Sequence, residues 1–329
     1  MHRPLLRRFS GVPWIKLAEL PTPVERFEVG AEFGLKELWI KRDDLTAPRY
    51  GGNKVRKLEF LLADAKARGA HTILTYGATG STHALATALY GREHGFRVVS
   101  ILSDEPPSPT VSQNLLLGAH WGAELVRCAV SGLYPLHAFR ARLSDTFLYE
   151  IPAGGSCPVG VLGFVNAGLE LAEQIKSGEL PPPAAILVAS GTSGTQTGLG
   201  IGLSIAGFAI PVIGVRVAAL ASEGRLQRLS RQTCRFLSGR GLSVPHPPGI
   251  RLLQDSKGEE ATWREAASAA GLNLTCTAKV LARGTEEIKR LGLEGKPVLF
   301  WNTDNGADLS AELEAADPRK VPPSFRSML

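Results

Sequence analysis

The sequence predicts an α/β fold with mainly parallel sheets, and three observations support this prediction. From about residue 71 onwards, apolar runs of strand length alternate with amphipathic stretches of helix length, which is typical of βαβ units. The runs at 186–188 and 212–215 are continuously apolar, as strands buried on both faces usually are. The 36 glycines and 22 prolines indicate many tight turns between these elements.

The alternating pattern assigns the elements in chain order. The expected strands are residues 71–76, 97–102, 124–128, 148–151, 185–189, 212–217, 250–253 and 297–301. The expected helices are a segment that begins near Lys54, then 81–94, 108–121, 136–146, 163–177, a helix from about Thr195, 225–237 and 259–270. Three consecutive prolines at 181–183 form the best linker candidate, although three residues make only a stiff loop.

Length, charge and cysteine content exclude several classes of protein. The 329 residues suffice for two domains or one large α/β domain. The four cysteines are scattered without a CxxC pair, which excludes a zinc ribbon and a disulfide scaffold and indicates a reducing compartment such as the cytoplasm. The net charge of +6 comes from basic residues spread along the chain. We therefore expect anionic small-molecule ligands, no nucleic-acid partner and no metal site.

Two segments resemble targeting or membrane sequences without meeting the criteria for them. Residues 1–11 are rich in arginine but lack the apolar core of a secretory signal. Residues 181–215 carry no charge, but polar and glycine residues at 190–198, and then Pro211, interrupt the apolar run. A membrane span needs about 20 continuous apolar residues. We expect a soluble protein with no membrane partner.

One loop between a buried strand and a helix is rich in serine, threonine and glycine. It reads Ala189-Ser-Gly-Thr-Ser-Gly-Thr-Gln-Thr-Gly198. Its backbone amides, its hydroxyls and the dipole of the following helix are suited to cradle a phosphate. The loop has no GKS or GKT and no GxGxxG spacing, which excludes the NTPase loop and weakens a dinucleotide interpretation. A tight turn in a crowded core is the alternative.

A lysine follows two glycines and an asparagine at the expected start of a helix, in Gly51-Gly52-Asn53-Lys54. Beside a helix N-terminus and near Arg56, the protonated form of the Lys54 amine would be disfavoured. An amine nucleophile that forms a Schiff base needs this property. The alternative is the solvated basic start of a helix, and we interpret Lys57, one turn further on, in that way.

A third loop leads from a strand into a helix and reads Tyr76-Gly-Ala-Thr-Gly-Ser-Thr-His-Ala84. Gly80, Ser81 and Thr82 offer backbone amides to an anion, for which a substrate carboxylate is the candidate. Ser81 and His83 are also able to move protons. For Ser81, the alternative is the N-cap of an ordinary helix.

Together these motifs resemble the fold-type-II pyridoxal-phosphate enzymes, in the branch of D-cysteine desulfhydrase and 1-aminocyclopropane-1-carboxylate (ACC) deaminase. The match covers nearly the whole chain, and the Gly-Gly-Asn-Lys-x-Arg-Lys-Leu-Glu run at 51–59 is specific to this branch. The resemblance implies two three-layer α/β domains of the tryptophan synthase β-like fold. Residues 1–54 plus 170–329 would form a large cofactor domain, and 55–169 a small domain inserted in it. Further matching segments are Leu20-Pro-Thr-Pro, Lys41-Arg-Asp-Asp, Ile151-Pro-Ala-Gly-Gly-Ser and Val298-Leu-Phe-Trp-Asn-Thr.

The resemblance also implies roles for individual residues. Lys54 would carry pyridoxal 5'-phosphate, Asn53 would hold the turn, and Ser81 would lie over the cofactor and take part in proton transfer. Thr303 would set a hydroxyl against the pyridine nitrogen, which leaves that nitrogen unprotonated and favours elimination over transamination. The neighbouring Asp304 is the alternative at this position. The implied phosphate site consists of Gly191, Thr192, Ser193, Gly194 and Thr195.

Two positions depart from the pattern of the branch. Thr82 replaces the asparagine that contacts the cofactor ring oxygen, and Cys276 replaces a tyrosine associated with substrate chemistry. Thr277 follows where ACC deaminase carries a glutamate, so ring opening of ACC is not expected. Cys276 is either a reactive thiol or a small buried filler. The expected substrate contacts are Gly80, Ser81, Thr82, His83 and Cys276.

The resemblance predicts a homodimeric, cytoplasmic lyase or deaminase that acts on a small amino acid. The expected reaction is β-elimination from a D-amino acid such as D-cysteine, with release of a keto acid and ammonia. β-Replacement and racemisation are alternatives on the same fold. Two alternatives come from other classes: a pyridoxal-phosphate-binding or regulatory protein without turnover, and a nucleic-acid-binding protein, which rests on net charge alone.

Overall fold

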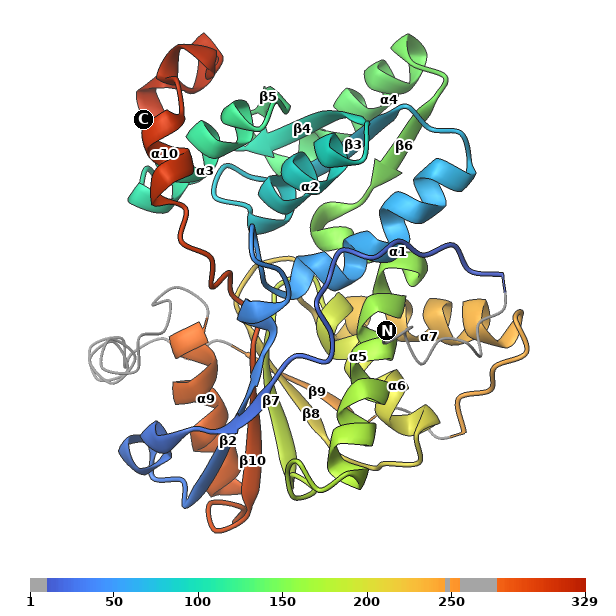
Figure 1. The fold of residues 1–329 in the computed structure, drawn as a ribbon, viewed down its shortest axis with the longest axis vertical. Coiled ribbons are helices and arrows are strands. Elements are labelled where there is room, and N and C mark those ends of the chain that lie inside the picture. Colours follow the sequence, from blue (N-terminus) through green and yellow to red (C-terminus); the bar gives the residue numbers. More distant parts are fainter. Residues whose placement is uncertain (1–10, 246–248, 255–276) are drawn as a thin grey trace. The chain divides into compact units, whose positions relative to one another are not determined.

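In the computed structural model, which describes residues 11–245, 249–254 and 277–329, the chain forms two compact units (Figure 1). The large unit contains Ala18–Lys57 and Ser156–Gly306, and the small unit contains Val12–Leu17, Leu58–Gly155 and Ala307–Leu329. The sequence-based domain boundaries, after residues 54 and 169, stay a prediction. The compact units divide after Lys57 and Gly155, and residues 307–329 belong to the small one.

The described part of the large unit holds one sheet, in the order β1-β2-β10-β7-β8-β9. Every neighbouring pair is parallel except β1 with β2, so the expected α/β class with mainly parallel sheets is confirmed. The strands are β1 (Val24–Arg26), β2 (Glu37–Arg42), β7 (Ala185–Ser190), β8 (Val212–Arg216), β9 (Ile250–Leu253) and β10 (Pro297–Asn302).

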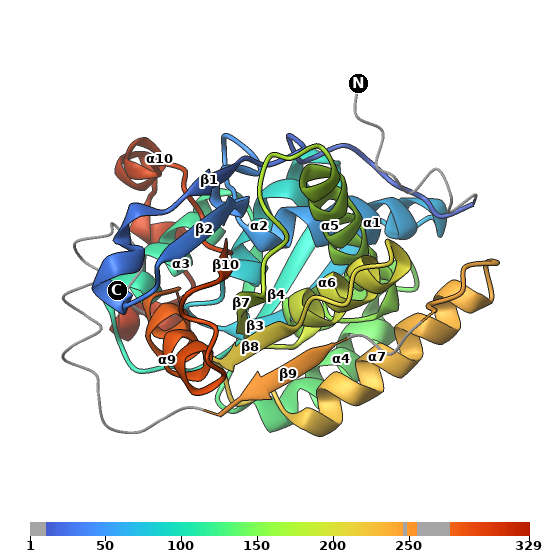
Figure 2. The same cartoon turned by 90° about the horizontal axis from the view of Figure 1, so that it is seen from below.

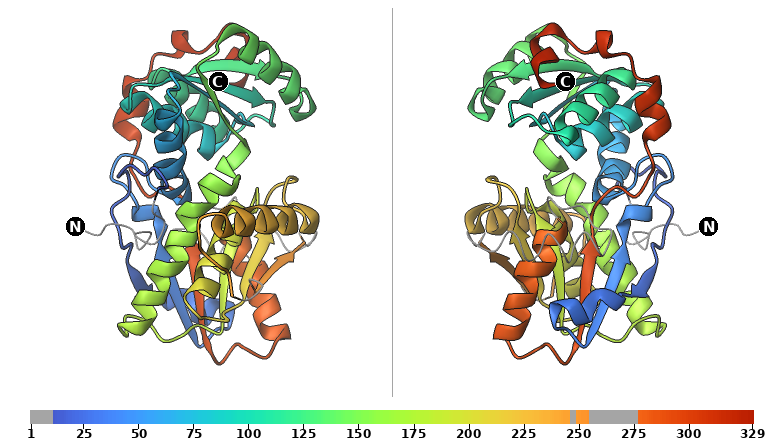
Figure 3. Two further views of the ribbon diagram at one scale, coloured as in Figure 1. Left: turned by 90° about the vertical axis from the view of Figure 1, so that its right-hand side faces the viewer. Right: turned by 90° about the vertical axis from the view of Figure 1, so that its left-hand side faces the viewer.

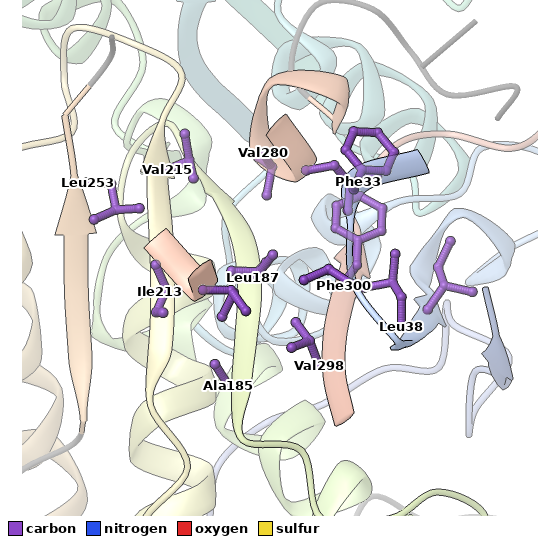
Figure 4. Close-up of a cluster of buried hydrophobic side chains, with 14 residues drawn as sticks. Phe33, Leu38, Ala185, Leu187, Ile213, Val215, Leu253, Val280, Val298 and Phe300 are labelled. Carbon is purple, nitrogen blue, oxygen red and sulfur yellow. The ribbon is translucent and has the colours of Figure 1, made fainter. Parts of the chain in front are cut away.

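Helices cover both faces of the large sheet, as Figure 2 shows. On one face, α9 (Thr277–Arg290) packs Val280 and Ile288 on the apolar side chains of the strands, a cluster drawn in Figure 4. On the other face, α5 (Pro158–Lys176) and α6 (Gly194–Ile205) cover a second apolar cluster that includes Trp301. Consecutive residues of one strand, such as Leu187 and Val188, therefore point to opposite faces of the sheet and pack in different hydrophobic clusters.

The small unit has a parallel sheet in the order β5-β4-β3-β6 among its described residues. Its C-terminal segment, red in Figure 3, lies against α3 (Pro109–His120), and Phe325 is fully buried there. The strands are β3 (Thr72–Ala78), β4 (Arg97–Ser103), β5 (Glu124–Cys128) and β6 (Leu148–Ile151). The remaining helices are α1 (Asn53–Ala67), α2 (Thr82–Glu93), α3 (Pro109–His120), α4 (Tyr134–Ser144), α7 (Glu223–Ser238) and α10 (Ser310–Ala315). None of the described helices combines the length and the apolar composition that a membrane crossing requires.

The structure adds elements that the sequence pattern did not indicate. Strands β1 and β2 lie before residue 71, where charged residues interrupt the apolar run, and α9 follows a polar stretch. Helix α5 begins at Pro158, five residues before the expected start, because proline is favoured at the first helical position. The helix expected at 259–270 lies outside the described residues.

A buried network of charges joins β2, α1 and α5 inside the large unit. Arg56 donates to Asp43 at 2.7 Å and to Glu170 at 2.8 Å, and Lys41 donates to Glu170 at 2.6 Å. The Thr22 hydroxyl donates a hydrogen bond to Asp43 Oδ1 at 3.0 Å. Burial alone raises the pKa of Glu170, but the charges of Arg56 and Lys41 outweigh burial and bring that pKa to about 2. The carboxylate therefore stays ionised inside the protein.

We expect Glu170→Gln to lower the free energy of unfolding by about 3 kcal/mol, because it leaves two buried cations with a single carboxylate. The wild-type protein should also lose stability as the pH falls from the ordinary value of 4.5 towards 2, since a lowered carboxyl pKa stabilises the fold only above that range. The variant should lack this component. Urea unfolding at several pH values measures both effects.

Glu173→Gln, on the same helix, is the matched control. Glu173 is exposed and pairs with Lys176 across one turn, so its loss should change stability by less than about 1 kcal/mol. Equal effects of the two substitutions would contradict the dependence of the fold on a fully paired buried network.

Candidate functional site

The turn before α1 is built so that no side chain separates it from the end of β10. A Cβ atom on Gly52, which has a φ of +91°, would lie 2.7 Å from the carbonyl oxygen of Asp304. A Cβ atom on Gly51 would lie 2.1 Å from the carbonyl oxygen of Asp44. The Asn53 amide donates to the Thr303 carbonyl at 3.2 Å. The glycines are therefore required for this close approach.

Lys54 lies in the first turn of α1. Its neighbour Asn53 links it to the loop at 189–198, which we call the Ser/Thr loop. Its Nζ donates to Asn53 Oδ1 at 2.7 Å, and Asn53 Nδ2 donates to Thr195 Oγ1 at 3.0 Å. Lys54 is partly exposed, whereas Asn53 is buried. The structure thus brings together Asn53, Lys54 and Thr195, three of the residues predicted for the site.

The Ser/Thr loop itself runs from β7 into α6 in a strained conformation. Ser193, immediately before α6, has a φ of 66°, a value that residues with a side chain rarely adopt. Its hydroxyl is buried, and so are those of Ser190 and Thr197. Within the described residues, these three hydroxyls have no hydrogen-bond partner. Buried polar groups are costly without one, so such a cluster indicates a ligand.

Lys57, in α1, packs against this loop, and the interpretation of it as a solvated residue is wrong. Its side chain is fully buried, and its Nζ would lie 2.8 Å from a Cβ on Gly194. Ser156 Oγ lies on the same side, 2.6 Å from Thr192 Oγ1. Burial lowers the pKa of Lys57 well below its ordinary value, and the positive charges of Lys54 and Arg225 lower it further.

Residues from distant parts of the chain, one of them the positively charged Arg225, lie around the loop, and the sequence pattern did not place them there. Arg225, in the first turn of α7, donates to the Thr192 carbonyl at 3.2 Å. Ser156 and Cys157 precede α5, far from the loop in sequence. The one available signal for Lys57 was its spacing of three residues from Lys54, which puts both on one side of α1.

Gly80, Ser81, Thr82 and His83 lie in the small unit, between β3 and α2. Ser81 is the N-cap of α2, and its Oγ accepts from the Ala84 amide at 3.2 Å. Thr82 is exposed, and His83 is buried with Nε2 3.2 Å from Thr75 Oγ1. Two of the three amides expected for an anion have partners within the protein: Gly80 donates to Glu105 and Ser81 to the Ala78 carbonyl.

Comparison with known proteins relates this geometry to a family. The family model described as pyridoxal-phosphate-dependent enzymes matches residues 15–304. The chain belongs to this family. D-cysteine desulfhydrases of Salmonella paratyphi A and Salmonella schwarzengrund are each 34% identical over 238 residues, which cover 69% of this chain and 71% of theirs. A crystal structure of an ACC deaminase homologue is 27% identical with a TM-score of 0.78, and the match covers 96% of this chain and 99% of that one.

These matches confirm the resemblance drawn from the motifs. The protein is a pyridoxal-phosphate-dependent enzyme of the lyase and deaminase branch, with the fold of type II. Cys276, expected to contact the substrate, lies outside the described residues.

The large unit fits the cofactor that the family uses. A phosphate group needs cations, hydroxyl donors and free amides, and the loop offers the buried Lys57, three hydroxyls without partners and the N-terminus of the 12-residue α6. Lys54 supplies an amine that Asn53 ties to this loop. The residues that would hold pyridoxal 5'-phosphate are therefore Asn53, Lys54 and Lys57, with Gly191, Thr192, Ser193, Gly194 and Thr195.

We expect Lys57→Met to weaken retention of the cofactor by about 10- to 100-fold, because a charge-assisted hydrogen bond to phosphate is lost. Methionine keeps the length and the apolar stem, so the fold should retain its stability. Equilibrium dialysis of the cofactor measures the affinity. Lys66→Met, an exposed position on the same helix, should leave it unchanged; equal retention by both variants would exclude Lys57 from the phosphate site.

Proposed function

We propose that this enzyme eliminates a β-substituent from a small D-amino acid such as D-cysteine and releases a keto acid and ammonia. One observation carries the proposal: the Lys54 amine is held by Asn53, which is itself bonded to Thr195 of the Ser/Thr loop. These two hydrogen bonds, which link the proposed nucleophile to the proposed phosphate site, support the proposal. The 34% identity to D-cysteine desulfhydrases supports the substrate class.

The bound cofactor supplies a ring that stabilises negative charge at the substrate Cα. Lys54 Nζ would be the attachment point for that cofactor, and its amine would move the proton at the substrate Cα. Asn53 Oδ1 orients this amine at 2.7 Å. The roles of Ser81 in proton transfer and of Thr82 at the cofactor ring rest on the resemblance, because both residues belong to the small unit.

We assign the contact with the pyridine nitrogen to Thr303. Its carbonyl accepts the Asn53 amide, which fixes the residue beside the turn that carries Lys54. A hydroxyl leaves the nitrogen unprotonated and favours elimination, whereas a carboxylate from Asp304 would protonate it. Thr303→Ala should alter the visible spectrum of the holoenzyme more than Asp304→Asn does; the reverse order would transfer the assignment to Asp304.

Lys54→Ala should abolish the visible absorbance of the lysine-bound cofactor, because it removes the amine to which we propose the cofactor attaches. An absorption spectrum of the purified variant, loaded with excess cofactor and then desalted, tests this. Replacement of Thr192 and Ser193 together should instead preserve the band at saturation but weaken the affinity. An unchanged band in Lys54→Ala would remove the lysine assignment.

Keto-acid release from D-cysteine, with L-cysteine and ACC alongside, tests the reaction. We expect rapid pyruvate formation from D-cysteine and not from L-cysteine, because the relatives are D-cysteine desulfhydrases. We expect no keto acid from ACC, because Thr277 stands where ACC deaminase carries a glutamate. Turnover of D-cysteine only when a second nucleophile is added would indicate β-replacement, and interconversion of its enantiomers would indicate racemisation. A lysine-bound cofactor without any turnover would favour a regulatory protein.

We further propose that the enzyme is a cytoplasmic homodimer. An apolar stripe on α4 supports self-association: Leu136, Phe139 and Leu143 are 46%, 58% and 71% exposed on the face opposite the buried Ala138. A helix that is apolar on two faces is usually covered on both. Sedimentation of Phe139→Glu should show dissociation, whereas Leu220→Glu, another exposed leucine, should leave the dimer intact.

A further inference from the structure

Glu105 holds the loop that contains Ser81. It lies between β4 and α3, and its Oε2 accepts the Gly80 amide at 2.8 Å. From the other side, Asn114 Nδ2 donates to the Gly80 carbonyl at 2.8 Å. The Gly80 peptide is thus fixed by one side chain on its amide and another on its carbonyl.

The contact requires glycine at position 80. A Cβ atom there would lie 2.9 Å from Glu105 Oε2, so any side chain would push the carboxylate away from the amide. Glu105 itself is exposed. Another anion readily displaces an exposed carboxylate from a backbone amide, because solvent screens the hydrogen bond and the side chain can rotate away.

The neighbouring acid behaves differently. Asp104 is paired with Arg127, at 2.8 Å to Nε and 2.7 Å to Nη2. Of two consecutive carboxylates, one therefore has a cation and the other has the amide of the loop expected to bind a substrate carboxylate. Two carboxylates cannot accept the same N–H without strong repulsion.

We propose that Glu105 is an internal stand-in for the substrate carboxylate, which occupies the Gly80 amide until a carboxylate ligand displaces it. This inference rests on the proposed function, in which the substrate is an amino acid whose carboxylate binds at Gly80–Thr82. Glu105 then sets substrate affinity. It keeps the loop ordered when no ligand is bound, and its negative charge repels a carboxylate ligand that binds the Gly80 amide.

Binding of D-alanine to the holoenzyme tests the proposal, because this amino acid carries the carboxylate but no β leaving group. Glu105→Gln keeps the length of the side chain and removes the charge, so the Kd for D-alanine should fall about three- to fivefold. Asp104→Asn makes the same change of charge one residue away and should leave the Kd unchanged. The change in the visible spectrum of the cofactor on titration reports binding.

A residue that only orders the loop would give the opposite result, weaker binding in Glu105→Gln, and this would overturn the proposal. The amide proton of Gly80, observed with ¹⁵N-glycine labelling, should move upfield in Glu105→Gln and not in Asp104→Asn. An unmoved resonance would show that the carboxylate does not hold this amide. Equal Kd values in all variants would overturn this inference alone, whereas no binding of D-alanine to any variant would overturn the proposed substrate class as well.

Discussion

The large unit depends on the guanidinium of Arg56, which is fully buried and bonded to both Asp43 and Glu170. A buried ion pair adds little net stability, but it specifies one arrangement because any other leaves a charge unpaired. Here it fixes the start of α1 against the end of β2 and the middle of α5. Since Asp43 also accepts the Gly52 amide through its carbonyl, the turn that presents Lys54 is set by the same interaction.

The Ser/Thr loop follows the opposite principle. Where the network around Arg56 satisfies every charge it buries, the loop leaves the hydroxyls of Ser190, Ser193 and Thr197 without partners among the described residues, and it strains the backbone at Ser193. Proteins concentrate such unfavourable features where a ligand relieves them. A loop whose buried hydroxyls lack partners within the described part of the chain, next to a fully bonded network, is suited to bind one small anionic group in a single orientation.

Strand-length apolar runs made most of the fold predictable from sequence, because parallel strands buried on both faces need side chains that are apolar at every position. Strand β2 was not predicted, because it contains Lys41 and so is not continuously apolar. The charge of Lys41 is neutralised by Glu170, which is 129 residues away in sequence. The burial of Lys57 was not predicted for the same reason, since the groups that enclose it come from just before α5 and from α6. Such partners are contributed by tertiary contacts, and a pattern read along one segment does not contain them. The motif around Lys54 was readable because its glycines and asparagine are local.

The burial of Lys57 has a consequence for how the cofactor is taken up. In the protein alone, burial and then the charges of Lys54 and Arg225 favour the neutral amine. A phosphate in the loop would favour the ammonium form, so capture of the cofactor takes a proton from solvent. Between the pKa of Lys57 in the free protein and its higher value in the complex, affinity should rise as the pH falls. A lysine that recognised the phosphate in this way would make the supply of active enzyme sensitive to the acidity of its surroundings.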